Sequence, residues 1–306
     1  MSAVGSQTKA DECREIRLEI AGVSLAVRSQ DPDLTFSLDG AAKGFVVEGG
    51  NADIEVTASW AHIREENIPS GDLLFDSGAV WRLLDCGGDY IFLFNSPILG
   101  PRPYKIARFN REFTKGRVIL NRDSFKAGIP VYPMEYPLDE LIVLNWLAQG
   151  RGIEMHSCGL IDSDGRGLLF AGQSGAGKTT TARLWENAEG VKILSDDRII
   201  LRKIGGEIWM HGTPWHGDAE LASPAAAKLD HVYFIKHGAG NSLSELSQAG
   251  AIARLFSCSF PPFHSHAGFD FTLGFMSEVA AAAACSELSF APGKEVVGFV
   301  RQAAAR

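Results

Sequence analysis

Residues 172–179, Gly-Gln-Ser-Gly-Ala-Gly-Lys-Thr, fit the phosphate-binding pattern G-x-x-x-x-G-K-[ST] at every fixed position. Residues 166–171, which are apolar after Arg166, predict a buried strand before this loop, and residues 178–187 predict a helix after it. Glycines let successive backbone N–H groups turn toward a phosphate, and the helix N-terminus adds a partial positive charge. The pattern therefore predicts a strand–loop–helix unit that binds a nucleotide.

Each residue type in this loop has a place in such a site. Lys178 can reach the β- and γ-phosphates, and the Thr179 hydroxyl can hold Mg²⁺. A chance match in a glycine-rich loop is the alternative, and the flanking strand and helix weigh against it. The residues expected to bind nucleotide are Gly172, Ser174, Gly175, Ala176, Gly177, Lys178, Thr179 and Thr180.

The overall charge and composition narrow the class of protein. The chain has 306 residues and a net charge of −8, which disfavours nucleic acid as the main partner. The N-terminal residues are polar, and no apolar stretch is long enough to span a membrane. Five dispersed cysteines suit reduced thiols better than a disulfide framework. We therefore expect a cytoplasmic protein that uses neither nucleic acid nor membrane as partner.

The pattern along the chain divides it into three parts. Residues 1–15 are expected to form a disordered lead. Residues 16–135 contain short alternating apolar runs separated by Gly, Asn, Asp and Pro, and they predict a β-rich domain that begins with a hairpin over 16–27. Residues 136–306 predict an α/β domain that opens with a helix at Pro137 and carries the phosphate loop.

The second domain alternates strands and helices. Expected strands cover 154–161, 167–171, 191–194, 198–203, 208–211, 231–235 and 288–290. Expected helices cover 178–187, 243–256, 271–285 and 294–301. In a phosphate-loop fold we expect the strand over 191–194 to lie directly beside the strand that precedes the loop.

Two aspartates follow the strand over 191–194. If that strand ends beside the loop, Asp196 can hold Mg²⁺ and Asp197 can accept a proton from an attacking hydroxyl. Two adjacent carboxylates also favour a bound cation, because their mutual repulsion disfavours ionisation of both groups when no positive charge is near. A solvated Asp-Asp turn is the alternative, and which aspartate has which role stays open.

These residues together resemble the core of HPr kinase/phosphorylase, a bacterial enzyme that phosphorylates a serine of a small carrier protein. The resemblance rests on His156, the loop from Gly172 to Thr179, and Leu194-x-Asp196-Asp197-Arg198, and it covers about residues 150–205. It implies a phosphoenolpyruvate carboxykinase-like P-loop kinase domain, an active-site role for His156, and MgATP as donor. Related enzymes form oligomers, so the resemblance also implies a homo-oligomer.

The chain departs from that family in one signature. The family carries Glu-Ile-Arg-Gly after the aspartates, whereas this chain has Gly-Thr-Pro-Trp-His-Gly-Asp over residues 212–218. That variant resembles uncharacterised HPr kinase-like proteins, some encoded beside peptide-modification genes. HPr itself is therefore not the expected acceptor.

Further residues have a functional and a structural interpretation. His216 and Asp218 belong to a loop that can contact substrate, or that only connects two elements around a buried Trp215. Arg254 can stabilise a transferring phosphate, although a surface arginine is the simpler interpretation for it and for Arg198. A metal site at His264 and His266 and a nucleophilic role for Cys158 are both disfavoured against ordinary loop and core positions.

Three functions compete. The first is an ATP- and Mg²⁺-dependent kinase that phosphorylates a hydroxyl of a peptide, a small protein or a small molecule. The second is a nucleotide-binding regulatory module with little turnover, whose β-rich domain grips a partner. The third is an ATPase or GTPase switch, and the lack of Asn-Lys-x-Asp disfavours its GTPase form. The kinase is the expected function.

Overall fold

A computed structural model describes residues 13–304 and shows a mixed α/β protein with two large sheets and few helices. Backbone contacts divide the chain into two compact units. The first holds most residues up to Asp139, and the second holds the chain from Glu140 onward with two short pieces, Glu19–Gly22 and Ala41–Phe45. From the sequence we expected the boundary at 135–136. Of the expected lead, residues 1–12 lie outside the described part, whereas Cys13 bridges to Phe36 and the first strand begins at Glu15.

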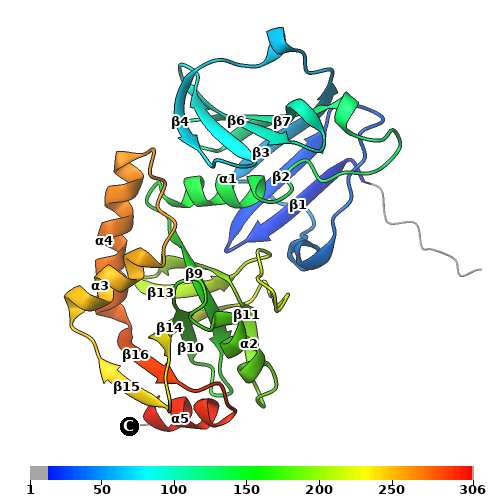
Figure 1. Ribbon diagram of the computed structural model, residues 1–306. Helices are drawn as coiled ribbons and strands as arrows, with labels where there is room; N and C mark the ends of the chain where they lie inside the picture. Colours follow the sequence, from blue (N-terminus) through cyan, green and yellow to red (C-terminus); the bar gives the residue numbers. More distant parts are fainter. Residues whose placement is uncertain (1–12, 305–306) are drawn as a thin grey trace, which may run out of the picture. The chain divides into compact units, whose positions relative to one another are not determined.

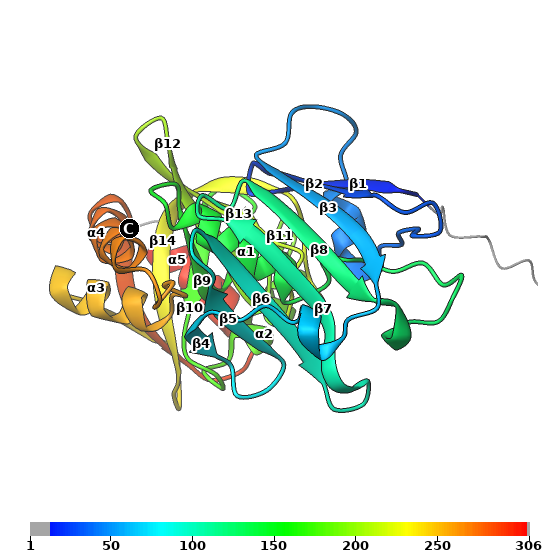
Figure 2. The same ribbon diagram turned by 90° about the horizontal axis from the view of Figure 1, so that it is seen from above.

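The first unit is one eight-stranded sheet in the order β1-β2-β3-β8-β7-β6-β5-β4 (Figure 2). Its strands are β1 (Glu15–Ile20), β2 (Val23–Ser29), β3 (Ile54–Ala61), β4 (Asp72–Asp76), β5 (Trp81–Asp85), β6 (Asp89–Ser96), β7 (Gly100–Asn110) and β8 (Lys115–Asn121). β3 pairs in parallel with both β2 and β8, and β4 to β8 form an antiparallel meander. Alternate residues of β1, such as Leu18 and Ile20, are buried, as the period of two in the sequence predicts.

The second unit carries the phosphate-loop motif and is built on a second eight-stranded sheet, which runs β10-β9-β12-β13-β14-β16-β15 with β11 added against β9. Its strands are β9 (Ile153–Ile161), β10 (Gly167–Ala171), β11 (Lys192–Ser195), β12 (Arg198–Ile204), β13 (Glu207–Gly212), β14 (Ala226–His237), β15 (Ser242–Glu245) and β16 (Ala284–Phe290). Its helices are α1 (Leu138–Leu147), which starts at the boundary, α2 (Lys178–Glu186), α3 (Gln248–Ser257), α4 (His266–Ala282) and α5 (Glu295–Ala304).

β9 is the central strand of the region around the loop. Its first half pairs with β12, and its second half pairs antiparallel with both β10 and β11. β10 and β11 therefore run in the same direction with β9 between them, and their carboxyl ends open at the same edge. The expectation that β11 lies directly beside β10 was wrong, because the strand that precedes β10 in the chain occupies that position.

Two apolar clusters lie around this sheet. One includes Phe170 of β10, Trp185 of α2 and Val300 of α5, so that α2 and α5 pack on the same side. The other includes Leu169 of β10, Leu255 of α3 and Phe275 of α4. Neighbouring residues of β10 thus point to opposite cores, and all five residues of that strand are buried. Figure 1 shows α3 beside α4, and α2 beside β10 and β11.

Two expected helices have different bounds in the structure. Residues 243–245 belong to β15, because Leu243 pairs with Leu288 of β16, and the Ser247 side chain caps α3 by accepting a hydrogen bond from Gly250 N–H. α4 begins at His266, upstream of the expected 271, because Ser265 caps it through Gly268 N–H. Apolar periodicity alone does not locate these serine caps.

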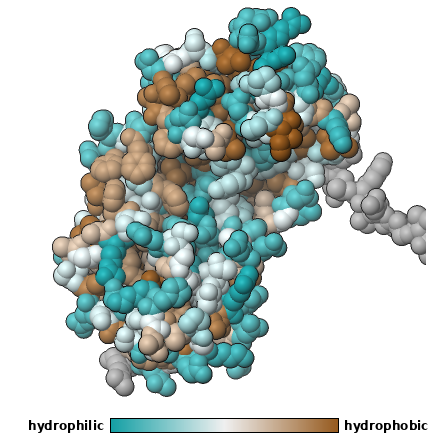
Figure 3. Space-filling view, viewed as in Figure 1, coloured by the Kyte–Doolittle hydropathy of each residue, from teal (hydrophilic) through white to brown (hydrophobic). Residues whose placement is uncertain are grey.

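The surface of the first unit carries apolar side chains. Figure 3 shows hydrophobic patches on the face in view. Exposed apolar residues of this unit include Leu73, Phe75, Val80, Ile98 and Leu99. Among residues 13–304, no helix combines the length and the apolar character that crossing a membrane requires.

Asp162, which follows β9, forms an ion pair with Arg301 of α5. The Arg301 Nη2–Asp162 Oδ1 distance is 2.6 Å and the Asp162 side chain is 1% exposed. Burial would raise the pKa of Asp162, but the hydrogen bonds from Arg301 and from Ser163 N–H outweigh it and lower that pKa. A lowered pKa means that the ionised carboxylate stabilises the fold above the ordinary pKa, and that this contribution is lost as the pH falls through the folded-state pKa.

We expect Asp162→Asn to lower the free energy of unfolding by about 2 kcal/mol at pH 7, since it removes charged hydrogen bonds to Arg301. The difference from the wild type should shrink as the pH falls below about 4. Urea unfolding at pH 7 and pH 3 measures both values. Asp164→Asn, in an exposed pair with Arg166, is the control and should change little. An Asp162→Asn loss of equal size at both pH values would contradict the prediction.

Candidate phosphate-binding and phosphotransfer site

The loop between β10 and α2 has a backbone that requires its glycines. Gly175 has a φ of 81° and Gly177 a φ of 107°, a region that residues with a side chain rarely adopt. A Cβ on Gly172 would lie 2.7 Å from the Cβ of Ala176. The three glycines of the motif therefore permit a tight turn that larger residues would disrupt.

The N-terminus of α2 is available to an anion. Gly177 is the N-cap and provides no side-chain acceptor, so the first N–H groups of the helix keep no partner within it. Gln173, Ser174 and Gly175 are exposed, and Thr179 in the first turn is half-buried. The partial positive charge of the helix end is thus presented beside an exposed turn, as phosphate binding requires.

Lys178 holds the loop through hydrogen bonds to its own backbone. Its side chain is almost fully buried, and Nζ donates hydrogen bonds to the carbonyl oxygens of Gly172 at 2.9 Å and Gln173 at 3.1 Å. Burial lowers the pKa of Lys178, and the negative charge of Asp197 opposes this shift. Since an ammonium has three donors, one N–H of Lys178 is left for a phosphate oxygen.

His156 and Asp197 meet at the same sheet edge. Ser157 pairs with Ala171, and His156 pairs with Arg198, so β9 brings His156 to the end of β10 where the loop begins. The His156 Nε2–Asp197 Oδ1 distance is 3.0 Å, and both side chains are about one-quarter exposed. His156 and Asp197, which were separate candidates in the sequence, are therefore in direct contact.

The carboxylate of Asp197 is held in its ionised form. Burial would raise its pKa, but the hydrogen bond from His156 and the charges of Arg198 and Lys178 together lower it. Arg198 also contacts Asp197 directly through Nη1. Asp197 is therefore an accessible negative charge between three cationic or proton-donating side chains.

Arg198 is the centre of a buried cluster of charges that sequence reasoning missed. Its Nε lies 2.8 Å from Glu140 Oε1 and 3.3 Å from Glu154 Oε1, and its guanidinium stacks over Phe260. Glu154 is fully buried, and its burial, followed by the charge of Glu140, raises its pKa well above the usual range. A single glutamate inside a buried strand and a lone glutamate in a helix gave no signal of this pairing.

Asp196 differs from Asp197 in its surroundings. It is fully buried, its Oδ1 accepts the N–H of Gly217 at 2.9 Å, and its Oδ2 accepts the N–H of Ala219 at 3.0 Å. A Cβ on Gly217 would lie 2.8 Å from Asp196 Oδ2. Asp196 therefore anchors the 212–219 loop through both carboxylate oxygens. Its expected role in holding Mg²⁺ stays a prediction.

The loop over 212–219 places its other candidates at different depths. Trp215 is buried, and its carbonyl accepts a hydrogen bond from Ser195 Oγ. His216 is half-buried with Nδ1 3.0 Å from the Gly217 carbonyl oxygen, and Asp218 is exposed. His216 and Asp218 are therefore on the accessible part of a loop that Asp196 holds in place.

Arg254 has its contacts on another part of the unit. Its Nη2 lies 2.5 Å from Glu287 Oε2 on β16, and its guanidinium carbon lies 5.9 Å from the centre of the Phe234 ring. Lys236 binds the other oxygen of Glu287. Arg254 is thus joined to Glu287, and within residues 13–304 it contacts neither the loop nor Asp197.

His237, which sequence reasoning also missed, contacts the loop. It ends β14, and its Nε2 lies 2.9 Å from the Gly175 carbonyl oxygen. β14 is parallel to β10, so its carboxyl end opens on the same edge as the loop. The expected strand over 231–235 stopped two residues short of this histidine, and a search just past the predicted strand end would have found it.

The remaining candidates have structural surroundings. Cys158 is fully buried, and its burial raises the pKa of its thiol. Ser265, between His264 and His266, caps α4. Within the part of the chain that the structure describes, no cluster of three His, Cys, Asp or Glu side chains has the geometry of a metal site.

Comparison of the sequence with protein-family models gave no match, and comparison with curated proteins gave none either.

Proposed function

We propose that this protein is an ATP-dependent phosphotransferase of the HPr kinase-like type, with a phosphoenolpyruvate carboxykinase-like P-loop domain. The observation that carries the proposal is the Asp197 carboxylate, which is bound to His156 at the sheet edge where Lys178 closes the phosphate loop. A simple nucleotide switch needs the loop but has no need of an accessible acid fixed beside it. The motif resemblance over residues 150–205 is the second support.

The residues at the loop fit a bound nucleotide. The positive-φ glycines and the uncapped N-terminus of α2 suit the phosphates, and Lys178 keeps one donor for the β- or γ-phosphate. The half-buried Thr179 hydroxyl would hold Mg²⁺ together with phosphate oxygens. ATP would supply the phosphoryl group, and Mg²⁺ would neutralise the charge that develops on it.

We assign Asp197 as the general base that accepts the proton of the acceptor hydroxyl. Its carboxylate would accept the proton of a substrate hydroxyl as the new O–P bond forms and the bond between the γ-phosphorus and the β–γ bridging oxygen breaks, with ADP as the leaving group. The lowered pKa of Asp197 makes it a weak base, which suits phosphoryl transfer because the transition state is loose and the proton leaves late. His156 and Arg198 orient this carboxylate.

Asp196 receives a different role from the one we expected. Both its oxygens bind backbone N–H groups and its side chain has no exposed surface, so it is poorly placed to ligate Mg²⁺ directly. We assign it to the position of the 212–219 loop. That loop would bring His216 and Asp218 toward the acceptor, which we propose to be a serine of a peptide or small protein, or a small-molecule hydroxyl. The five free cysteines and the use of ATP suit the cytoplasm.

The test is transfer of the γ-phosphate of labelled ATP to acceptors in lysate of the source cells. We expect Lys178→Ala to lower transfer about 100- to 1,000-fold, because it removes a preorganised positive charge at the phosphates. Lys192→Ala, at an exposed lysine of β11, is the matched control and should transfer as the wild type does. Equal transfer by Lys178→Ala would refute the proposal. Tight MgATP binding without any transfer would instead favour the regulatory module.

A further inference from the structure

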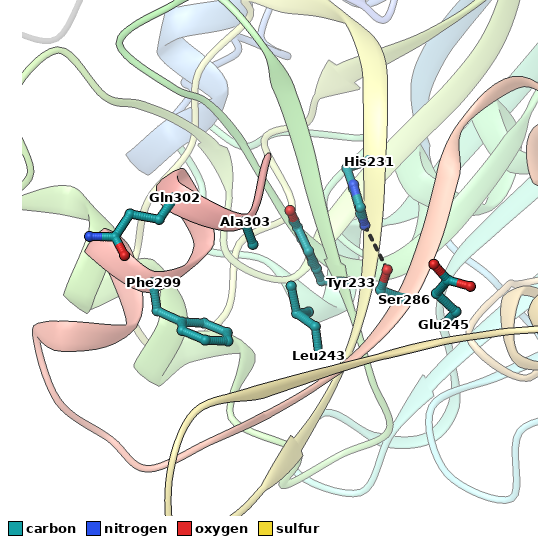
Figure 4. A pocket seen from close by; sticks show the side chains of 8 residues that line it. All are labelled: His231, Tyr233, Leu243, Glu245, Ser286, Phe299, Gln302 and Ala303. Atoms are coloured by element: carbon teal, nitrogen blue, oxygen red, sulfur yellow. Dashed lines mark hydrogen bonds between the residues drawn. The ribbon is translucent and has the colours of Figure 1, made fainter. Parts of the chain in front are cut away.

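A cavity of about 490 Å³ opens in the second unit, bordered by β14, β15, β16 and α5. Figure 4 shows Phe299 and Gln302 of α5 on one side and His231, Ser286 and Glu245 of the strands on the other. This volume lies within the range of small-molecule sites in proteins. The proposed phosphate transfer does not involve this cavity.

The cavity is separate from the phosphate loop. His231 and Tyr233 border it, whereas His237 of the same strand contacts Gly175. His231 and Tyr233 lie in the middle of β14, whereas His237 is its last residue. The four residues from Tyr233 to His237 span about 13 Å of β-strand, so the cavity and the phosphate loop contact different parts of β14. A ligand bound in the cavity would therefore not occupy the nucleotide site.

On β14 and β16 the polar groups of the cavity wall are uncharged. The His231 ring stacks on Tyr233 with 3.9 Å between centroids, and His231 Nε2 lies 3.1 Å from Ser286 Oγ. Burial, with a smaller effect from Arg166, lowers the pKa of His231 to about 4, so this ring is neutral at pH 7. The Tyr233 hydroxyl is buried and has no hydrogen-bond partner among the described residues, a state that is rare unless a further group completes it.

The charge of the cavity is negative. Glu245 is the one charged side chain among the described residues that line it, it is exposed, and it forms no side-chain hydrogen bond or ion pair in the described part of the chain. Among residues 13–304, the cavity lining includes neither lysine nor arginine, so these residues offer a phosphate or carboxylate no counter-charge. An ammonium group, by contrast, would find a carboxylate and the faces of aromatic rings.

The apolar side chains of the cavity indicate what the uncharged part of a ligand would be. Phe299 and Leu243 line the cavity together with the ring of Tyr233. These groups favour an aromatic ring, which also fits an edge or face against Phe299. From the cavity, its charge and its rings, we propose that this is a binding site for a small aromatic amine, independent of the nucleotide site.

The test uses ligand-observed saturation-transfer NMR on the intact chain with tyramine, phenethylamine and tryptamine. The matched acids 3-(4-hydroxyphenyl)propionate, 3-phenylpropionate and indole-3-propionate have similar rings and the opposite charge. We expect saturation transfer to the amines and little to the acids. Excess MgATP should not displace the amines. No transfer to any of the three amines, equal transfer to amines and acids, or displacement by MgATP would each overturn the proposal.

Two variants locate the binding. Glu245→Gln should weaken amine binding about fivefold, the effect of losing one exposed ion pair. Glu207→Gln, at an exposed glutamate paired with Lys228, is the control and should bind as the wild type does. Ala303→Phe should fill the cavity and abolish binding. If Glu245→Gln, whose changed side chain is exposed, binds the amines with unchanged affinity, the assignment of the ammonium to this cavity is wrong.

Discussion

Asp197→Asn is expected to lower phosphate transfer about 1,000-fold, within the range for loss of a general base, while MgATP affinity stays within a few-fold of the wild type. Asparagine keeps the shape of the side chain and a hydrogen-bonding group toward His156, but it cannot accept the acceptor's proton. It also removes a negative charge near the phosphates, so nucleotide binding has no reason to weaken. Single-turnover transfer and equilibrium nucleotide binding measure the two quantities separately.

The matched control for this prediction is Asp270→Asn, at an exposed aspartate of α4. It makes the same chemical change away from the sheet edge and should leave transfer unchanged. A loss in Asp197→Asn that came from weakened MgATP binding alone would show that Asp197 acts on the nucleotide or the metal. Full transfer by this variant would remove Asp197 from the reaction.

Arg198→Ala is expected to lower the free energy of unfolding by about 3–5 kcal/mol, the usual cost of removing one partner from a buried ion pair. Arg198 is the shared partner of Asp197, which is about one-quarter exposed, and of Glu140 and Glu154, which have little or no exposure. Without the guanidinium, these acids would lose the charge that favours their ionised forms. Urea unfolding of the intact chain measures the loss.

The same variant should gain stability as the pH falls. Unpaired buried carboxyl groups have raised folded-state pKa values, so their destabilising effect is present at neutral pH and fades as the pH falls through those raised values toward the ordinary pKa. Arg254→Ala is the control, since its pair with Glu287 is partly exposed and should contribute at most about 1 kcal/mol. Adding Glu140→Gln to Arg198→Ala should restore part of the stability. A loss that does not vary between pH 5 and pH 7.5 would contradict this account.

These two arginines show what the sequence could not provide. Arg198 and Arg254 had the same interpretation as surface arginines, yet one is enclosed by three acids and the other pairs with Glu287 near solvent. The difference depends on Glu140 and Glu154, which come from α1 and β9 and meet Arg198 only after the sheet has formed. A local pattern carries no information on such distant partners.

Local features were easier to predict than the order of the strands. The strand before the phosphate loop was expected over 167–171, and β10 has these bounds because its apolar run and its flanking glycines are local signals. The place of β9 between β10 and β11 is a property of the whole sheet and was not predicted. The contrast between Asp196 and Asp197 was also inaccessible, because it depends on the backbone of residues 217 and 219.

Successive side chains of β9 point to opposite faces of the sheet, so the site depends on the length of the connection between α1 and β9. Met155 faces one core and is fully buried, whereas its neighbour His156 reaches Asp197. Losing or gaining one residue between α1 and β9 would shift the strand by one position, turn Met155 toward the acid, and bury the imidazole among apolar side chains. The number of residues in this short connection is therefore constrained by the chemistry at the far edge of the sheet, and natural variants should differ there by substitution more readily than by insertion or deletion.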